Sequence, residues 1–274
     1  MKPAEGMAKL RYSRRDVGAM SVPVFIINLD RSPERLTKIS QRLAILGVNF
    51  SRVQAIDGLE LPIDDLARYQ AKDIAWSPLK AGEIGCFLSH RKCWEMIERS
   101  PYNFGCVMED DAVISDRFPE AIISARNLPD YVDVLKLDTT FKRVWLDRGS
   151  IDVHSIHASR LRSGHYGAGA YIVSKNAAKV LLAKSKTFAI GVDVFLFDPL
   201  IGAAHDLRVY QCAPAVCGHD YFIYPGKETD TTIGVERHYS IDNKLSWRLK
   251  KWSDEIRKVS HLAMGRKRVS IPLA

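Results

Sequence analysis

Three consecutive carboxylates, Glu109, Asp110 and Asp111, follow a short apolar run in the segment GCVMEDDAVIS at residues 105–115. Adjacent carboxylates repel one another and raise each other's pKa unless a cation lies among them. The segment contains no Lys or Arg that could supply this positive charge. A divalent metal ion would resolve the clash, and a hydrated surface loop would also tolerate it.

The chemical types of the side chains indicate which metal ion the three carboxylates would bind. Carboxylates without a cysteine or histidine cluster favour Mg²⁺ or Mn²⁺ over zinc, and such ions usually bridge carboxylates to the phosphates of a substrate. A zinc site at Cys212, Cys217 and His219 has no obvious fourth ligand. The five cysteines form no CxxC pair, so we interpret them as reduced thiols in or near the core.

A second group of polar residues lies at the end of the largely apolar run Val22–Leu29, in the segment INLDR. In open α/β sheets, ligands bind outside the carboxyl ends of the strands, and the N-terminus of the next helix favours an anion. Asn28, Asp30 and Arg31 are therefore candidate ligand-binding residues. The alternative is a turn that leads into the helix, with Asp30 and Arg31 in solvent.

Strands and helices alternate along most of the chain. Ser32 suits an N-cap with Pro33 at the first helical position, and Gly47 ends the predicted helix over 32–46. The poor alternation of residues 139–157, interrupted by Gly149, favours a loop or hairpin. The other predicted elements are strands at 48–55, 104–108 and 132–137, a helix at 81–100, a strand and helix within 167–185, and a short strand within 206–216. This order predicts an α/β fold with a mostly parallel central sheet.

Composition and motifs narrow the class of protein. A chain of 274 residues with 46% hydrophobic residues is long enough to bury a sizeable core. No stretch approaches the roughly 18 apolar residues of a spanning helix, and the start lacks a signal-peptide core, so we expect a cytoplasmic protein. A GxxxxGK[ST] loop and a GxGxxG that opens a helix are both missing, which disfavours NTPases and dehydrogenases.

The end of the chain is strongly basic. Residues 244–268 hold nine Lys or Arg against Asp254 and Glu255, a net charge of +7. Apolar residues recur there at spacings of four and three: Leu245, Leu249, Trp252, Ile256, Val259 and Ala263. This pattern predicts an amphipathic helix on an anionic membrane surface, where each basic residue contributes about 1 kcal/mol. Alternatively, the apolar stripe packs on the rest of the protein. We expect no nucleic-acid binding, because no recognition module accompanies the basic residues.

These observations divide the chain into a flexible N-terminal extension at 1–20, a catalytic domain at 21–243 and a basic tail at 244–274. If the tail binds lipid, the protein is peripheral at the inner face of the cytoplasmic membrane. Binding pockets are often built from variable loops, so residues 59–80 and 139–165 are expected to contribute to a ligand pocket.

Eight motifs, in order, resemble those of glycosyltransferase family 25, the lipooligosaccharide galactosyltransferase type. The resemblance spans about residues 22–240, and GEIGC followed by SH, together with EDD after an apolar strand, makes it specific. The motifs are VFIINLDRSPERL, AIDG, GEIGCFLSHRKCWE, VMEDDAVI, DVLKLD, GAGAYIVSKNAAKVLL, GVDVFL and QCAPAV. The resemblance implies a GT-A-like Rossmann-type fold, a UDP-hexose donor and Mn²⁺ (or Mg²⁺) dependence. It also implies inverting transfer of galactose or glucose, giving a β-linkage to a saccharide acceptor such as the lipopolysaccharide core.

The resemblance assigns the acidic run to the metal and the donor. Asp111 would be a direct metal ligand, with Glu109 or Asp110 on the ribose or on a metal-bound water. His219, in VCGHDYF, is the candidate for a further ligand from late in the chain, and an ordinary histidine is the alternative. The metal would stabilise the charge on the departing UDP.

The resemblance also extends to residues that would bind the donor. Three residues after the first strand would flank the uridine and the diphosphate: Asn28, Asp30 and Arg31. Glu83, Ser89 and His90 belong to the helix that carries GEIGC and SH. Glu83 would meet the sugar, although a helix-capping role is the alternative.

Inverting transfer needs a base that takes the proton of the acceptor hydroxyl, normally a carboxylate. Asp193 in GVDVFL is the first candidate and Asp138, after the VLKL strand, the second; a role at a helix N-terminus is the alternative for Asp193. Gly167 and Gly169 would allow close approach of the backbone near the donor, or tight packing.

Two other classes of protein fit the same features. A Mg²⁺-dependent nucleotidyltransferase or phosphohydrolase would also use clustered carboxylates. A catalytically silent, membrane-associated module that binds a nucleotide sugar would keep the fold without turnover.

Overall fold

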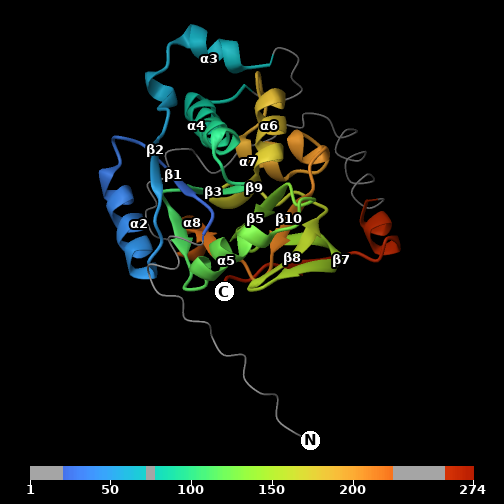
Figure 1. Cartoon of the computed structure of the whole chain (residues 1–274). Coiled ribbons are helices and arrows are strands. Elements are labelled where there is room, and N and C mark those ends of the chain that lie inside the picture. The colour runs from blue at the N-terminus through green and yellow to red at the C-terminus, as the bar shows by residue number, and fades with distance from the viewer. Residues whose placement is uncertain (1–20, 72–77, 225–256) are drawn as a thin grey trace, which may run out of the picture.

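A nine-stranded sheet forms the middle layer of the protein, with helices on both faces (Figure 1). The computed structural model describes residues 21–71, 78–224 and 257–274. Across the sheet the strands lie in the order β12 (Lys267–Ser270), β7 (Arg143–Val153), β8 (Ile156–Leu161), β10 (Val209–Cys212), β5 (Val134–Lys136), β9 (Ala170–Ser174), β3 (Phe104–Glu109), β1 (Val24–Asn28) and β2 (Ser51–Gln54).

The α/β class is confirmed, but the sheet is mixed rather than mostly parallel. β2, β1 and β3 run parallel, as do β5 and β10. β9 lies antiparallel between β3 and β5, and the strands β10, β8, β7 and β12 pair antiparallel in turn. The difference arises because β9 reverses the chain direction in the middle of the sheet, and because β7 and β8 form a hairpin beyond β10.

The two faces of the sheet bury separate apolar clusters. In β1, Phe25 and Ile27 face one cluster while Val24 and Ile26 face the other, as expected for a strand buried on both sides. Helices of the first cluster are α4 (Ala81–Arg99), α6 (Lys175–Lys184) and α7 (Val192–Phe197). Those of the second are α2 (Pro33–Leu46) and α5 (Phe118–Ser124), on the opposite side of the sheet in Figure 1.

Helix α2 confirms the predicted helix over 32–46. Pro33 stands at its first position, and Gly47 ends it in the left-handed conformation with φ of 69°. The Gly47 N–H donates to the carbonyl of Ala44, which completes the last turn. Since β1 and α2 are separated by only a few residues, the N-terminus of α2 lies at the carboxyl end of β1.

A second, three-stranded sheet brings together segments that are distant in sequence. β11 (Cys217–His219) lies between β4 (Ala112–Ile114) and β6 (Asp138–Thr139). Its register pairs His219 with Ala112 and Cys217 with Asp138. His219 is thereby placed beside the acidic run, and Asp138 follows on the other neighbouring strand. The short helix α8 (Asp220–Ile223) begins directly after His219.

The structure corrects the prediction for residues 139–157, most of which form the long strand β7 and its turn into β8. A register shift between Leu146 and Ser150 interrupts the β7–β8 pairing, and this irregularity hides the alternation expected of a strand. The remaining described elements are α3 (Ile63–Tyr69) and three 3₁₀ turns at η1 (Gly58–Glu60), η2 (Ala125–Asn127) and η3 (Ala203–His205).

The end of the chain joins the sheet. Residues 257–263 are helical, but the predicted basic helix does not extend to 268, because Lys267–Ser270 pair with β7 as the edge strand β12. Ile271 is buried in the first cluster. Residues 1–20 and 244–256, which carry the predicted extension and most of the predicted helix, lie outside the described residues, as does the predicted boundary at 243.

Among the described residues, no helix combines the length and the apolar character needed to cross a membrane.

Candidate active site

The acidic run lies where β1 and β3 end side by side. These strands are parallel, and their register pairs Ile27 with Glu109, so the residues that follow both strands meet at one edge. A pocket at this edge is lined by residues of β1, α2, the 55–58 loop, α4, the acidic run and β11. The predicted site residues among its lining are Asn28, Arg31, Ser89, His90, Glu109, Asp110, Asp111 and His219.

Asn28 is buried and positions Asp110. Its Nδ2 donates to Asp110 Oδ2 at 2.7 Å and to the carbonyl of Ser32 at 2.9 Å, while its Oδ1 accepts from Arg52 Nε at 3.0 Å. Arg35 Nη1 lies 3.2 Å from Asp110 Oδ1. Burial raises the pKa of Asp110, and the contacts with Asn28 and Arg35 oppose that rise. The Asn28 amide is thus engaged with the protein, and it acts on the site through Asp110.

Asp111 pairs with His219. His219 Nε2 lies 3.2 Å from Asp111 Oδ2, and Arg35 Nη1 lies 3.9 Å from the same oxygen. Burial would raise the pKa of Asp111, but the hydrogen bond and charge of His219 lower it overall. Burial likewise opposes protonation of His219, yet Asp111 and the neighbouring acids raise its pKa to about 9. The other oxygen, Asp111 Oδ1, is buried and has no hydrogen-bond partner among the described residues.

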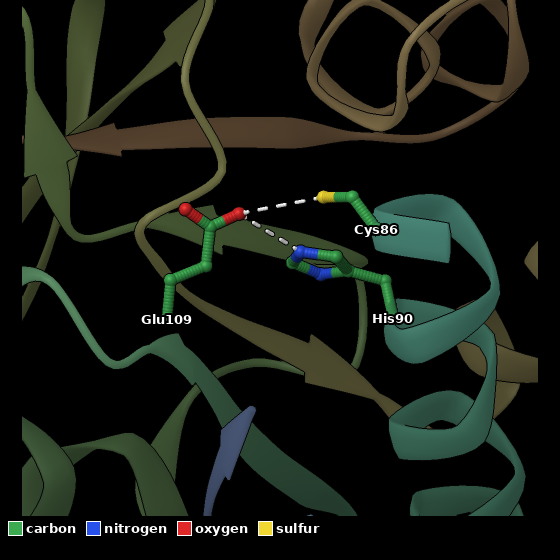
Figure 2. A group of neighbouring side chains, drawn as sticks. All are labelled: Cys86, His90 and Glu109. Carbon is green, nitrogen blue, oxygen red and sulfur yellow. Dashed lines mark hydrogen bonds and ion pairs between the residues drawn. The ribbon is translucent and has the colours of Figure 1, made fainter. Parts of the chain in front are cut away.

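Two groups of side chains in this pocket have the geometry to hold a metal ion. Ligand atoms of Glu109, Asp111 and His219 lie within 4.8 Å of one another, and so do those of Cys86, His90 and Glu109. Glu109 belongs to both groups. In the second group, His90 Nε2 lies 3.1 Å from Glu109 Oε1 and the Cys86 sulfur lies 3.8 Å from the same oxygen (Figure 2). Burial and the nearby carboxylates hold the pKa of the Cys86 thiol well above its usual value.

Four predicted binding residues have structural partners within the protein. Asp30 is outside the pocket lining and forms an ion pair with Arg52. The Glu83 carboxylate accepts from the Lys80 N–H at 2.7 Å, which is the capping role that the sequence left open. Ser89 lines the pocket, but its hydroxyl donates to Gly85 O and accepts from Ile56 N. Arg31 lines the pocket and pairs with Asp57.

Close packing of two backbones forms one pocket wall. A Cβ on Gly85 would lie 2.5 Å from the carbonyl oxygen of Ile56, and a Cβ on Gly58 would lie 1.7 Å from that of Ala81. Only glycine allows helix α4 to approach the 56–58 loop this closely. This contact explains why the AIDG and GEIGC motifs each carry a glycine.

The two predicted bases both lie against a glycine loop, and neither is among the residues that line the pocket. Asp193 Oδ2 accepts from the Gly167 N–H at 3.0 Å, and its Oδ1 accepts from the Val194 N–H at 2.8 Å. Asp138 is buried, and its Oδ1 accepts from Lys136 Nζ at 2.6 Å. Its Oδ2 has no partner among the described residues and lies 3.4 Å from the position of a Cβ on Gly169. Because the Gly169 carbonyl accepts from the Glu109 N–H at 3.0 Å, this loop adjoins the acidic run.

A family model described as "Glycosyltransferase family 25 (LPS biosynthesis protein)" matches residues 21–196, which contain nearly all of this pocket. The chain belongs to glycosyltransferase family 25. This membership confirms the resemblance seen in the sequence motifs.

Several proteins with curated names are similar to the chain. A putative glycosyltransferase of Haemophilus influenzae is 24% identical over 81% of this chain and 79% of its own length. A glycosyltransferase 25 family member of Drosophila melanogaster is 30% identical over 68% of this chain, but only 32% of its own length is matched. The lipooligosaccharide biosynthesis protein lex-1 of Haemophilus influenzae is 25% identical over 61% of this chain and 58% of its own length. The chain therefore spans about a third of the insect relative and most of the first bacterial one.

Among solved structures, the chain is similar to a glycosyltransferase involved in the glycosylation of the major capsid of PBCV-1. The two share 10% identity with a TM-score of 0.41, over 73% of this chain and 92% of that chain.

For this family 25 member, sequence reasoning missed several pocket residues. The acidic run seemed to lack a nearby cation, but Arg35 of α2 contacts Asp110 and Asp111 from 75 residues away in sequence. The signal for Arg35 was available: it stands in the first turn of a helix whose N-terminus follows a strand end. Asp57 and Cys86 also line the pocket and were not predicted. The one sequence signal for them was that they stand in the AIDG and GEIGC motifs.

Proposed function

We propose that this family 25 glycosyltransferase transfers galactose or glucose from a UDP-sugar to a saccharide acceptor of the lipopolysaccharide or lipooligosaccharide core. The transfer would depend on Mn²⁺ or Mg²⁺ and would invert the anomeric centre, giving a β-linkage. The observation that carries the proposal is the group of Glu109, Asp111 and His219 at the edge where β1 and β3 end. Two relatives support the sugar and the acceptor by name, the lipooligosaccharide biosynthesis protein lex-1 and a procollagen galactosyltransferase of Xenopus laevis.

The residues of the acidic run suit a hard divalent cation. Glu109 and Asp111 supply carboxylate oxygens and His219 an imidazole, a set of donors that suits Mn²⁺. Asp111 Oδ1 supports this fit, because it is a buried oxygen without a partner among the described residues. When bound, the metal would neutralise the charge that develops on the departing diphosphate.

The basic residues around the pocket would serve the donor. Arg31 and Arg35 line the pocket at the N-terminus of α2, where backbone N–H groups also favour a phosphate. Each arginine now pairs with an aspartate, Arg31 with Asp57 and Arg35 with Asp110. Both aspartates hold guanidinium groups at the pocket wall, where they would attract and orient an anionic nucleotide sugar.

Among the two candidate bases, the hydrogen bonds favour Asp138 over Asp193. Both oxygens of Asp193 accept backbone N–H bonds, whereas Asp138 keeps one oxygen without a partner among the described residues. Burial raises the pKa of Asp138, with Lys136 opposing that rise, and a raised pKa suits a general base. If Asp138 is the base, Asp138→Asn lowers kcat far more than Asp193→Asn, with little change in the KM for the donor. Thermal unfolding must show that Asp138→Asn is folded, because the change leaves the buried Lys136 without its ion-pair partner.

The described end of the chain supports peripheral binding to an anionic membrane at the inner face of the cytoplasmic membrane. Val259, Leu262 and Met264 are 65%, 65% and 64% exposed within a segment rich in Lys and Arg. Apolar side chains among basic residues suit insertion at an anionic lipid surface. Leu262→Asp should reduce co-sedimentation with anionic vesicles. The matched control is Leu200→Asp, which changes a leucine that is 58% exposed elsewhere on the surface.

A donor screen tests the proposed reaction. The protein is incubated with UDP-galactose or UDP-glucose, with and without Mn²⁺, and with and without a core saccharide acceptor. Release of UDP that requires both Mn²⁺ and the acceptor supports the proposal. Turnover of phosphoesters without a sugar acceptor would favour a phosphohydrolase or nucleotidyltransferase, and tight UDP-sugar binding without turnover would favour a silent binding module.

A further inference from the structure

A buried row of hydrogen bonds ends on Glu109. Trp94 Nε1 donates to Tyr171 Oη at 2.8 Å, Tyr171 Oη lies 2.9 Å from His90 Nδ1, and His90 Nε2 lies 3.1 Å from Glu109 Oε1. The side chains of Trp94, Tyr171 and His90 are fully buried. Trp94 and His90 stand one turn apart on α4, and Tyr171 faces them from β9.

The chemistry of these groups fixes the position of each proton. An indole N–H can only donate, so Tyr171 Oη is the acceptor from Trp94. The Tyr171 hydroxyl hydrogen then has one acceptor among the described residues, the Nδ1 of His90. His90 must therefore carry its proton on Nε2, and this N–H donates to the carboxylate of Glu109.

The opposite tautomer fails at both ends of the row. With the proton on Nδ1, Tyr171 Oη would accept two N–H bonds, and its own hydrogen would lack an acceptor among the described residues. The bare Nε2 lone pair would also face the Glu109 carboxylate at 3.1 Å, which is repulsive. Buried polar groups that lose their partners are costly, so the Nε2–H form is strongly preferred.

The row fixes which oxygen of Glu109 faces a ligand. His90 and Cys86 both contact Oε1, and in Figure 2 the other oxygen, Oε2, points away from both side chains. With its proton on Nε2, His90 offers no lone pair toward the pocket. In this form His90 therefore does not serve as a ligand in the group of Cys86, His90 and Glu109.

We propose that Trp94, Tyr171 and His90 are positioning residues that lock the Glu109 carboxylate, so that Oε2 is presented to the metal and nucleotide sugar. His90 then acts through Glu109 rather than by touching substrate, unlike the sequence-based expectation for it. This inference rests on the proposed function, which supplies the metal and the nucleotide sugar as the ligands of Glu109. The tautomer of His90 can be tested independently of that function.

The tautomer is read by NMR of the ligand-free protein labelled with ¹⁵N-histidine. His90 is assigned by comparison with His90→Gln, and the two ring nitrogens of a neutral histidine have distinct shifts and couplings. We expect a proton on Nε2 and none on Nδ1, as the hydrogen bonds require. A proton on Nδ1, or on both nitrogens, would overturn the proposal.

The positioning role is read by calorimetric titration of UDP in the presence of Mn²⁺. Tyr171→Phe removes only the hydroxyl, and loss of such outer partners costs about 10–100-fold in affinity at metal sites. We expect weaker binding by at least about 10-fold, and a similar loss for His90→Ala. His90→Gln, whose amide N–H can still reach Glu109, should recover part of that loss.

Tyr210→Phe is the matched control, because Tyr210 lies on β10 outside the row of hydrogen bonds. This variant should bind UDP with the same affinity as the wild type. Thermal unfolding of each variant checks that it is folded, and Trp94→Phe provides a second variant if Tyr171→Phe does not fold. Wild-type affinity in folded Tyr171→Phe and Trp94→Phe would overturn the proposal. A wild type that binds no UDP with Mn²⁺ would instead overturn the proposed function, and the NMR measurement would still decide the tautomer.

Discussion

At the end of the sheet formed by β1 and β3, Asp110 and Asp111 both contact Arg35, and Asp111 also contacts His219. One buried oxygen of Asp111 has no partner among the described residues. At the β7 and β8 end, a single acid, Asp147, contacts two arginines. Its oxygens lie 2.6 to 2.9 Å from Arg162 and 3.2 Å from Arg266.

The comparison distinguishes two kinds of charged group. Asp147 is fully paired within the protein and stabilises the fold, whereas the acidic run has negative charge left over that a ligand could neutralise. Asp147 and its arginines join β7, β8 and the chain just before β12, and every strong contact is already made within the protein. The acidic run carries more negative charge than its neighbours neutralise, and it lies in a pocket. A cationic ligand would therefore gain more at the β1 and β3 end.

The largest expected effect belongs to Asp111. Asp111→Asn removes one negative charge and a proposed metal ligand, so we expect metal-dependent transfer to fall by about 100-fold or more. Asp111→Asn also breaks the ion pair with His219, so thermal unfolding is measured to show that the variant is still folded. Steady-state assays across a Mn²⁺ series measure the effect, and unaltered kcat and Mn²⁺ dependence would contradict the assignment of the cation to this end.

A second prediction concerns the pocket wall. Gly85→Ala places a methyl group 2.5 Å from the Ile56 carbonyl oxygen, so it should cost about 2–3 kcal/mol of the free energy of unfolding. Gly149→Ala is the matched control on β7, because a Cβ there meets nothing within 4 Å. Urea unfolding of the two variants compares both ends of the sheet directly. Equal losses would show that the close approach of α4 is not a constraint.

The third prediction concerns His165, which is buried in the half of the sheet away from the pocket. Burial lowers its pKa from 6.5 to about 3, while Gln211 and Thr140 hold the neutral ring in place. The unfolded chain therefore takes up this proton below pH 6.5 and the folded protein does not, so stability falls as the pH falls. Between pH 7 and pH 5 the loss should be about 2 kcal/mol.

Unfolding in urea at a series of pH values measures this loss. His165→Gln removes the titrating group, so its free energy of unfolding should depend less steeply on pH over the same range. An equal slope in both proteins would show that another group causes the acid sensitivity.

The smallest expected effect is that of Asp147. Asp147→Asn breaks ion pairs that are partly exposed, so it should cost about 1 kcal/mol of stability. Transfer activity should equal that of the wild type, in contrast to Asp111→Asn. A large loss of transfer activity in Asp147→Asn would contradict the view that the charges at the β7 and β8 end serve only the fold.

The elements around the pocket could be predicted because their signals are local. The apolar run before Asn28, the proline at the start of α2 and the αL glycine at its end stand within 25 residues of one another. The strands around β7 could not be predicted in the same way, because they pair with strands that are distant in sequence. β12 pairs with β7 from more than 100 residues away, and the register shift after Leu146 obscures the alternation in β7.

The candidate site shows the same division. The acidic run was evident because three carboxylates after an apolar strand are conspicuous in sequence. Its partner Arg35 was not, because it reaches the run from α2. His219 and His90 were candidates only through the family resemblance, and the structure places both in contact with the run. The sequence could not show that Asn28 and Asp30 have different roles. In the structure the side chain of Asn28 is buried against Asp110, whereas Asp30 pairs with Arg52 outside the pocket.

Anomalous diffraction from crystals of the protein grown with Mn²⁺ and UDP tests the central claim most directly. We expect one manganese peak among Glu109, Asp111 and His219, with the diphosphate of UDP on the same ion. A peak among Cys86, His90 and Glu109, or UDP bound at this edge of the sheet without manganese, would contradict it.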